Sequence, residues 1–467
     1  MSRADKSKRA ARLADLRRRL PDLPLATAAG DLEHYGRDWT RFHTPDPLAV
    51  AFVREIEEIQ EVVRWAADCG QPLVPSGGRT GLSGGAVAAA GELVVSLERL
   101  RAETGFDAAG RILHVEGGMV TAEVQRRARQ RGLYYPVDFA AAGGSQIGGN
   151  VATNAGGIRV LRYGLTRDQV AGLTVIDGRG ERLELNRSLV KNATGYDLRH
   201  LLIGSEGTLG IVAGVQLTLR PPPPPAGVML LALADIAGLM AVFETARAQL
   251  DLSAFEFFTQ PCTAAVCAAQ GLPPPFEPAA PAYALLEFDQ MPGDESRALG
   301  LFEHLLAAGL AADGVLAQSA AQAARLWRYR EAISESIAPR TPYKNDIAVT
   351  IDQVPAFLAQ LDELVRMHYP DYEVLWYGHL GDGNLHMNVL RPAAMAISTF
   401  QALADRLSEL VYEKVGDFHG SISAEHGIGL LKKDGLHFSR AAGEIDAMRA
   451  IKRIFDPAGI LNPGKVF

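Results

Sequence analysis

Hydrophobic and polar positions along the chain predict both helices and strands. Over 56–69 the apolar residues fall on one face, a pattern typical of an amphipathic helix. Further helices are predicted over 10–20, 121–131, 236–250, 295–308, 321–336, 354–368, 400–415 and 441–455. Short apolar runs predict strands over 72–75, 93–96, 112–115, 210–219, 229–233, 282–288, 343–351, 374–377 and 385–389. The two halves of the chain differ in how these elements are joined.

Glycine-rich loops adjoin the predicted strands of the first half. Ser76–Gly85 holds five glycines in ten residues, and similar runs occupy 143–157 and 204–210. Glycine allows positive φ angles and close approach to a ligand, and consecutive N–H groups form a nest for an anion such as pyrophosphate. None of these loops has the G-x-G-x-x-G or G-x-x-x-x-G-K-[ST] pattern, which disfavours nicotinamide-Rossmann and P-loop sites. Together they predict one extended site, and FAD fits it better than NAD.

Strands alternate with helices in the second half, where no glycine fingerprint occurs. This order predicts an antiparallel sheet backed by helices, so the chain is placed in the α+β class. The proline run 221–225 predicts a stiff, extended spacer between domains. We expect an FAD-binding domain over 1–222, a substrate-binding cap domain over 227–425, and a C-terminal segment, 426–467, that returns to the first domain.

Composition narrows the functional classes. The 467 residues are 48% hydrophobic and carry a net charge of -7, which argues against a general nucleic-acid binder. No apolar run approaches the ~20 residues that a membrane helix needs. Three cysteines without a C-x-x-C pair favour a reducing compartment, and we expect the cytoplasm. The basic segment 2–20 has no apolar stretch, so we do not expect a secretory signal. Because Asp5 and Asp15 interrupt the basic residues, a solvated helix over 10–20 is favoured over a transit peptide.

Histidines gather near the C-terminus. Five of the eleven lie between 379 and 437, namely His379, His386, His419, His426 and His437. This density indicates a metal and proton-transfer site, although a single histidine is more often a hydrogen-bonded core residue. His379 and His386 flank a glycine-containing turn that would have to fold back to bring them together. His419 and His437 belong to no motif and are predicted to lie at the surface or to support the site from behind its ligands.

The motifs of both halves resemble one group of flavoproteins. The first-half runs are similar to the FAD domain of the vanillyl-alcohol-oxidase / p-cresol-methylhydroxylase superfamily: 76–85, 148–157, 191–197 and 204–210. The second-half runs resemble its flavin-linked D-2-hydroxy-acid dehydrogenase branch: 378–386, 423–427 and 460–464. Within that branch, 327–334 and 342–346 are most similar to bacterial members that oxidise D-2-hydroxyglutarate. The resemblance extends from about Asp38 onward and implies a two-lobed FAD-binding domain with an α+β cap.

The resemblance also implies roles for individual residues. His379, His386 and Glu425 match metal ligands, with zinc as the usual ion, and His426 matches the general base. Arg330, Ser334, Lys344 and Asn388 match substrate-binding positions, although Arg330 could instead pair with a buried acid. The implied cofactor-binding residues are Ser76, Gly77, Gly78, Arg79, Thr80, Gly81, Ser83, Gly143, Ser145, Gly148, Gly149, Thr153, Asn154, Glu206, Gly207, Gly210, Ile211 and Asn462. Since the first loop has no histidine, we expect non-covalent FAD.

The implied activity is oxidation of a D-2-hydroxy acid. The flavin N5 takes the hydride, a divalent metal stabilises the developing alkoxide, and a histidine takes the proton. D-2-hydroxyglutarate oxidised to 2-oxoglutarate is favoured, with electrons passed to a carrier such as an electron-transfer flavoprotein. D-lactate or another D-2-hydroxy acid remains an alternative substrate, and a non-catalytic flavin redox subunit is a second alternative. The oligomeric state stays open, with a homodimer among the options.

Overall fold

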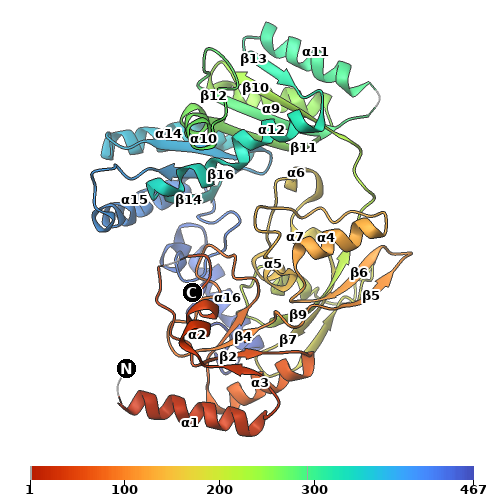
Figure 1. Cartoon of the computed structure of the whole chain (residues 1–467), viewed down its shortest axis with the longest axis vertical. Helices are drawn as coiled ribbons and strands as arrows, with labels where there is room; N and C mark the ends of the chain where they lie inside the picture. The colour runs from red at the N-terminus through yellow and green to blue at the C-terminus, as the bar shows by residue number, and fades with distance from the viewer. Residues whose placement is uncertain (1–2, 41, 292) are drawn as a thin grey trace. The chain divides into compact units, whose positions relative to one another are not determined.

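The computed structural model describes residues 3–40, 42–291 and 293–467 (Figure 1). The predicted basic segment begins at Ser2, which lies outside these residues. The chain forms two compact units. Unit 1 comprises 1–157, 164–222 and 425–467, and unit 2 comprises 158–163 and 223–424. The short helix α6 (Val160–Tyr163) therefore belongs to unit 2, although its neighbours in sequence belong to unit 1.

Unit 1 contains two β-sheets. In the four-stranded sheet, ordered β1-β2-β4-β3, the strands β2, β4 and β3 run parallel and β1 is antiparallel. The five-stranded sheet is antiparallel, in the order β5-β6-β9-β7-β8. The strands are β1 (Leu25–Ala26), β2 (Ala49–Phe52), β3 (Leu73–Ser76), β4 (Leu93–Ser96), β5 (Glu103–Asp107), β6 (Ile112–Glu116), β7 (Val170–Ile176), β8 (Arg182–Leu185) and β9 (Ile211–Thr218).

Several helices of unit 1, among them α3 and α4, contribute residues to the apolar cores beside these sheets. The helices of unit 1 are α1 (Arg3–Arg19), α2 (Ala29–Tyr35), α3 (Ile56–Cys69), α4 (Thr121–Gln130), α5 (Ile147–Thr153), α7 (Thr166–Gln169), α8 (Arg199–Leu202) and α16 (Ala442–Phe455), with the 3-10 helix η5 (Lys433–Phe438). One apolar core joins α3, the parallel strands and the buried tail residues Ile460 and Leu461. Leu461 also forms a β-bridge with Leu73, so the C-terminal tail completes the first sheet.

Unit 2 is built on a seven-stranded antiparallel sheet ordered β13-β10-β12-β11-β15-β16-β14. Its strands are β10 (Ala226–Leu233), β11 (Leu252–Thr259), β12 (Ala282–Asp289), β13 (Ala311–Leu316), β14 (Tyr343–Ala348), β15 (Val374–His379) and β16 (Asn384–Val389). Its remaining helices are α9 (Leu239–Gln249), α10 (Gln260–Gln270), α11 (Asp294–Ala307), α12 (Ala320–Glu331), α13 (Ile333–Ile337), α14 (Val354–His368) and α15 (Ile397–Asp417). Short 3-10 turns η1 (Ile236–Gly238), η2 (Ala338–Arg340), η3 (Ile351–Gln353) and η4 (Leu380–Asp382) connect them.

Helices cover both faces of this sheet. Phe258 and Tyr377 pack with residues of α10, α12 and α13, whereas Phe255 contacts Phe243 of α9 on the opposite face. The Trp376 indole donates to Asp362 of α14 on that opposite face. Side chains alternate along a strand, so neighbouring residues of β11 and β15 meet different helices. The predicted α+β fold, with an antiparallel sheet backed by helices, is confirmed.

Some elements differ from the sequence prediction. The strands β1, β2, β5, β7, β8, β11 and β13 and the helices α2, α5, α6, α7, α8 and α10 were not predicted. Apolar runs such as those of β7 and β11 do not distinguish strand from helix where clear alternation is lacking. The single helix predicted over 321–336 is two helices, α12 and α13, separated at Ala332. Among the described helices, none has the length and apolar character that crossing a lipid bilayer requires.

Candidate functional site

Unit 1 contains a cavity whose walls come from the three glycine-rich runs. The predicted cofactor-binding residues line this cavity with three exceptions, Gly143, Ser145 and Asn154. Two of the exceptions have polar contacts of their own: the hydroxyls of Ser145 and Thr121 lie 2.8 Å apart, and Asn154 accepts from the backbone N–H of Arg167. The lining residues that were not among the individually predicted ones are Pro75, Gly85, Ala86, Leu97, Gln146, Asn150, Ala152 and Val212.

Some of these residues could have been identified as lining residues from the sequence alone. Gln146, Asn150 and Ala152 lie inside the second glycine run, so treating the whole run as lining would have included them. Leu97 directly follows β4, whose four residues are all buried, and Val212 belongs to β9. Their position at the cavity depends on strand pairing, which has no local motif.

The cavity has the chemical character that a polar cofactor needs. Ser76 Oγ, Gln146 Oε1 and Asn462 Oδ1 line it and are buried, and none of the three has a hydrogen-bond partner among the described residues. Buried polar atoms are normally paired, so these atoms are suited to a ligand that donates and accepts hydrogen bonds. A Cβ added at Gly149 would meet no atom within 4 Å, so the wall leaves open space there. These residues fit FAD.

Two ionisable residues of the cavity wall are perturbed by burial. Burial lowers the pKa of Arg79, whose guanidinium lies 4.4 Å from the Tyr35 ring centroid. Burial also raises the pKa of Glu206, although backbone N–H groups oppose this shift. Both residues, like Asn462, have positive φ angles (58°, 51° and 44°), which non-glycine residues rarely adopt. Such backbone strain clusters at functional sites.

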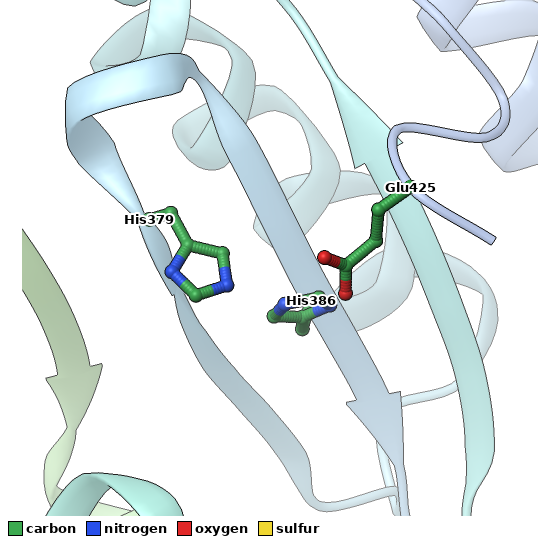
Figure 2. Close-up of side chains that lie close together, drawn as sticks. All are labelled: His379, His386 and Glu425. Carbon is green, nitrogen blue, oxygen red and sulfur yellow. The ribbon is translucent and has the colours of Figure 1, made fainter. Parts of the chain in front are cut away.

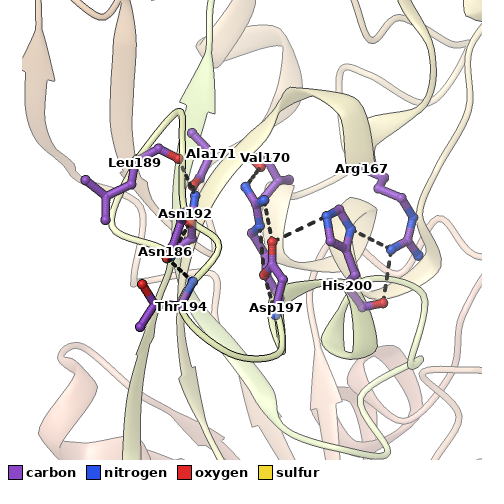
Figure 3. A network of polar contacts seen from close by, with 10 residues as sticks. Arg167, Val170, Ala171, Asn186, Leu189, Asn192, Thr194, Asp197 and His200 are labelled. Atoms are coloured by element: carbon purple, nitrogen blue, oxygen red, sulfur yellow. Dashed lines mark hydrogen bonds and ion pairs between the residues drawn. The ribbon is translucent and has the colours of Figure 1, made fainter.

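The run 191–197 lies apart from the lining residues, on a loop held by polar contacts (Figure 3). Asn192 donates to Asn186 Oδ1, and Asn186 in turn donates to the carbonyl of Ala171. Asp197 pairs with Arg199 at 2.7 Å. The Arg167 guanidinium donates to the carbonyls of His200 and Ile203, and the Arg167 backbone N–H donates to Asn154 Oδ1. The network thus fixes this loop to the segment that follows α5.

His379 and His386 stand on adjacent strands of unit 2. His379 ends β15, and His386 lies on β16 opposite Tyr377. The turn η4 and Gly383 fold the chain back, and Gly383 has a φ of 76°. A Cβ there would lie 2.1 Å from the Val349 carbonyl oxygen, so glycine is required. The two imidazole centroids are 5.4 Å apart, which confirms the predicted fold-back of the turn.

Glu425 completes a group of three side chains of the kinds that can bind a metal ion. It follows directly on Ala424, whose N–H donates to the Asp346 carbonyl on β14. One ligand atom from each of His379, His386 and Glu425 lies within 4.8 Å of the other two, and Figure 2 shows the side chains turned toward one another. Two imidazoles and one carboxylate are a donor set typical of catalytic zinc, because a three-residue set leaves a coordination position open. The group fits a divalent metal.

A buried carboxylate orients the first of these ligands. Glu256 on β11 is 1% exposed, and its Oε1 lies 2.6 Å from Nδ1 of His379. Burial by itself would lower the pKa of His379. The charge of Glu256 and its hydrogen bond outweigh this effect and raise the pKa of His379 to about 9. With Nδ1 engaged, Nε2 is the nitrogen left for a metal. The sequence analysis missed Glu256 because it lies within the apolar run of an unpredicted strand.

Strand alternation brings further predicted residues to the same face of the sheet. Lys344 is paired with Asn388 across β14 and β16, and Asp346 with His386. Lys344 Nζ donates to Ser334 Oγ at 2.7 Å. Asn388 is 1% exposed, and its Oδ1 has no hydrogen-bond partner in the described part of the chain. The three predicted substrate residues Ser334, Lys344 and Asn388 therefore offer polar atoms, one of them unsatisfied.

The remaining histidines and Arg330 differ in their contacts and exposure. Arg330 Nε lies 2.8 Å from Glu256 Oε2, and its guanidinium stacks 4.7 Å from the Tyr377 ring centroid. Arg330 thus pairs with a buried acid, the alternative that the sequence left open. His426 Nε2 lies 3.5 Å from Glu425 Oε1. His419 and His437 are exposed.

Family models match most of the chain. A model described as "FAD linked oxidases, C-terminal domain" matches residues 223–466, and one described as "FAD binding domain" matches residues 47–186. The second-half match begins at residue 223, within the proline run 221–225.

Curated relatives are similar over nearly the full length. A D-2-hydroxyglutarate dehydrogenase of Xanthomonas citri pv. viticola is 55% identical over 459 residues, covering 98% of this chain and 97% of that protein. One of Stutzerimonas stutzeri is 50% identical over 442 residues, covering 94% and 95%. The mitochondrial D-2-hydroxyglutarate dehydrogenase of Bos taurus is 37% identical over 459 residues, covering 97% and 83%.

Solved structures share the fold at low identity. The 4-ethylphenol oxidase from Gulosibacter chungangensis superposes with a TM-score of 0.73 at 16% identity, covering 98% of this chain and 97% of that one. An alkyldihydroxyacetonephosphate synthase superposes with a TM-score of 0.71 at 15% identity, covering 97% and 84%. At this identity the likeness supports the fold alone.

Proposed function

The chain belongs to the family of FAD-linked oxidases, and we propose that it oxidises D-2-hydroxyglutarate to 2-oxoglutarate with the help of FAD and zinc. The observation that carries the proposal is the approach of His379, His386 and Glu425 to within 4.8 Å. Their donor atoms suit a divalent metal that binds a hydroxy acid. The identity of the full-length relatives supports the choice of substrate.

The oxidation removes a proton from the hydroxyl oxygen and a hydride from C2. When bound, FAD supplies the hydride acceptor, and a divalent metal stabilises negative charge on the substrate oxygen. His379, His386 and Glu425 would hold the metal, and Glu256 would keep His379 in the required tautomer. His426 would take the hydroxyl proton, since an imidazole exchanges protons near neutral pH.

Polar residues of unit 2 would bind the carboxylates of the substrate. Lys344 supplies an ammonium group and Ser334 a hydroxyl, and the two already contact each other at 2.7 Å. The unsatisfied Oδ1 of Asn388 lies on the strand residue paired with Lys344. Arg330 would act on the substrate through its charge while remaining paired with Glu256. The Lys344–Ser334 pair favours a diacid, because lactate has no second carboxylate to occupy it.

The proposal extends to the partners of the reaction. Reduced FAD must pass two electrons on, and we assign this step to a protein carrier such as an electron-transfer flavoprotein. The described structure has three free cysteines, Cys69, Cys262 and Cys267, which is in keeping with a reducing compartment such as the cytoplasm.

Anaerobic reduction of the bound flavin tests the proposal. Purified protein loaded with FAD and zinc is mixed with D-2-hydroxyglutarate, D-lactate and other D-2-hydroxy acids, and the loss of flavin absorbance is followed. We expect the highest kcat/KM for D-2-hydroxyglutarate and loss of activity after chelation. A higher kcat/KM for D-lactate than for D-2-hydroxyglutarate would make D-lactate the preferred substrate. If no acid bleached the flavin, the protein would instead be a redox subunit without turnover.

A further inference from the structure

Glu206 has an unusual backbone and surroundings. It stands in the third glycine run, is 8% exposed, and has a φ of 51°, a left-handed conformation that a long side chain rarely adopts. Its N–H donates to the Ala152 carbonyl at 2.8 Å, and its carbonyl accepts from Asn462 at 2.7 Å. The residue is thus fixed on both sides of its backbone within the wall of the FAD cavity.

The carboxylate of Glu206 binds the segment that follows the predicted ligand and base. Oε1 accepts from the N–H of Ile428 at 2.7 Å, and Oε2 accepts from the N–H of Gly429 at 2.8 Å. Gly427 runs so close that an added Cβ would lie 2.9 Å from Glu206 Cδ. Two parallel hydrogen bonds to an ionised acceptor are strong and fix direction as well as distance.

The first glycine loop holds the other side of the same segment. The Ser83 carbonyl accepts from the N–H groups of Leu430 and Leu431, at 2.9 and 3.1 Å. A Cβ on Gly429 would lie 2.2 Å from that carbonyl oxygen. Both Ser83 and Glu206 line the FAD cavity. Residues 427–431 are therefore clamped between two walls of the cofactor site, all within unit 1.

We propose that Glu206 is a positioning residue, which fixes 427–429 so that Glu425 and His426 are held in place for the metal and the substrate. This inference rests on the proposed function for the roles of Glu425 and His426. Glu425 lies three residues before the first N–H group that Glu206 binds, which leaves the chain little freedom between them. Cofactor loading and the fixing of the metal carboxylate are thereby linked through one side chain.

Glu206→Gln is the diagnostic variant. A carboxylate offers two acceptors to two N–H donors, whereas glutamine offers one acceptor and directs an NH₂ group at the other donor. Asp177→Asn is the matched control, since Asp177 is 3% exposed in unit 1 and its Oδ1 accepts from the N–H groups of Arg179 and Glu181 at 2.9 Å. The control makes the same change of carboxylate to amide at a buried turn outside the residues that line the cavity.

Two measurements on FAD-saturated protein test the proposal. Hydrogen exchange of a peptide covering 425–431 should become at least tenfold faster in E206Q and stay unchanged in D177N. Zinc affinity, measured by chelator competition, should fall about tenfold in E206Q, the lower end of the loss seen when groups supporting a ligand are removed, and stay unchanged in D177N.

The positioning role of Glu206 and the proposed function of the protein can fail independently in these measurements. Wild-type exchange and zinc affinity in E206Q would overturn the positioning role and leave the proposed function intact. Faster exchange with unchanged zinc affinity would also overturn it, because the anchor would then not reach Glu425. A wild-type protein that binds no zinc and reduces no flavin would remove the proposed function, while faster exchange in E206Q would still establish the anchor.

Discussion

Oε1 of Glu256 lies 2.6 Å from Nδ1 of His379, and this contact leaves Nε2 as the imidazole nitrogen open to the proposed metal. Burial disfavours the Glu256 charge, yet His379 and Arg330 hold the pKa of this carboxyl below its usual range. An ionised carboxylate accepts from Nδ1–H and leaves Nε2 as the ligand. Carboxylate–histidine pairs of this kind raise ligand basicity as well as fixing its orientation.

Replacing Glu256 with glutamine should therefore weaken metal binding. We expect a 10- to 100-fold lower zinc affinity by chelator competition, since the amide holds the tautomer less firmly and adds no basicity. Glu287→Gln is the control, because Glu287 is 3% exposed on the neighbouring strand and pairs with Arg159 instead of a predicted ligand. Equal zinc affinity in E256Q and wild type would show that His379 is not held by Glu256.

A second prediction concerns the space that FAD would fill. A side chain at Gly149 would meet no atom of the chain within 4 Å, yet Gly149 lines the cavity. Gly149→Leu should leave the thermal unfolding of the cofactor-free protein within a few degrees of wild type, because a surface-like change has a small effect on stability. Its dissociation constant for FAD, by fluorescence quenching, should rise at least tenfold.

Gly143→Leu serves as the comparison for that experiment. Gly143 also has no neighbour within 4 Å of an added Cβ, but it is not among the residues that line the cavity. We expect wild-type FAD affinity in this variant. Equally weakened FAD binding in both variants would show that the cofactor extends beyond the cavity. Weakened FAD binding in G143L alone would show that the cofactor lies at Gly143 and not at Gly149.

Much of the cofactor cavity could be predicted from the glycine runs, because their backbone freedom depends only on the local sequence. A run such as Ser76–Gly85 shows its permissive backbone directly in the sequence, and the structure places most of its residues around the cavity. The same holds for His379 and His386, where the glycines of the turn indicate that the chain folds back. The helix over 56–69 was likewise predictable, since its apolar stripe has helical spacing.

Glu256 and the anchoring role of Glu206 were not predictable in this way. Glu256 stands in an apolar run that resembles a buried helix as much as a strand, and its partner His379 is 123 positions away. Glu206 binds N–H groups 222 and 223 positions further on. Such contacts depend on which strands pair and which loops meet. No periodicity in the sequence records that information.

Substrate choice is tested at Lys344. Its ammonium group donates to Ser334 Oγ at 2.7 Å and is suited to bind a second carboxylate. A charge-assisted hydrogen bond contributes about 1.5–3 kcal/mol, so Lys344→Met should lower kcat/KM for D-2-hydroxyglutarate about 10- to 100-fold. The value for D-lactate, which has one carboxylate, should change by less than threefold. Equal losses for both acids would instead assign Lys344 to the carboxylate that they share.

The last prediction concerns Lys465, a residue of the C-terminal tail that is 2% exposed. Burial lowers its pKa from 10.5 to about 8, although Glu92 and Asp38 oppose the shift. Below pH 8 the folded and unfolded chains both carry the proton, so the full cost of the buried charge is present. Between about pH 8 and 10.5 only the unfolded chain carries it, and the free energy of unfolding should rise with pH across that window.

Lys465→Met removes the titrating group and fills a similar volume. The variant should be more stable than wild type at pH 7 by up to about 3 kcal/mol, and this difference should shrink as the pH approaches 10. Urea denaturation of cofactor-free protein at pH 7 and 9.5, followed by circular dichroism, measures both values. Lys6→Met, at an exposed position of α1, is the control and should match wild type at both pH values. A stability difference between K465M and wild type that stays constant with pH would mean that the Lys465 ammonium keeps its proton in the folded protein throughout this range.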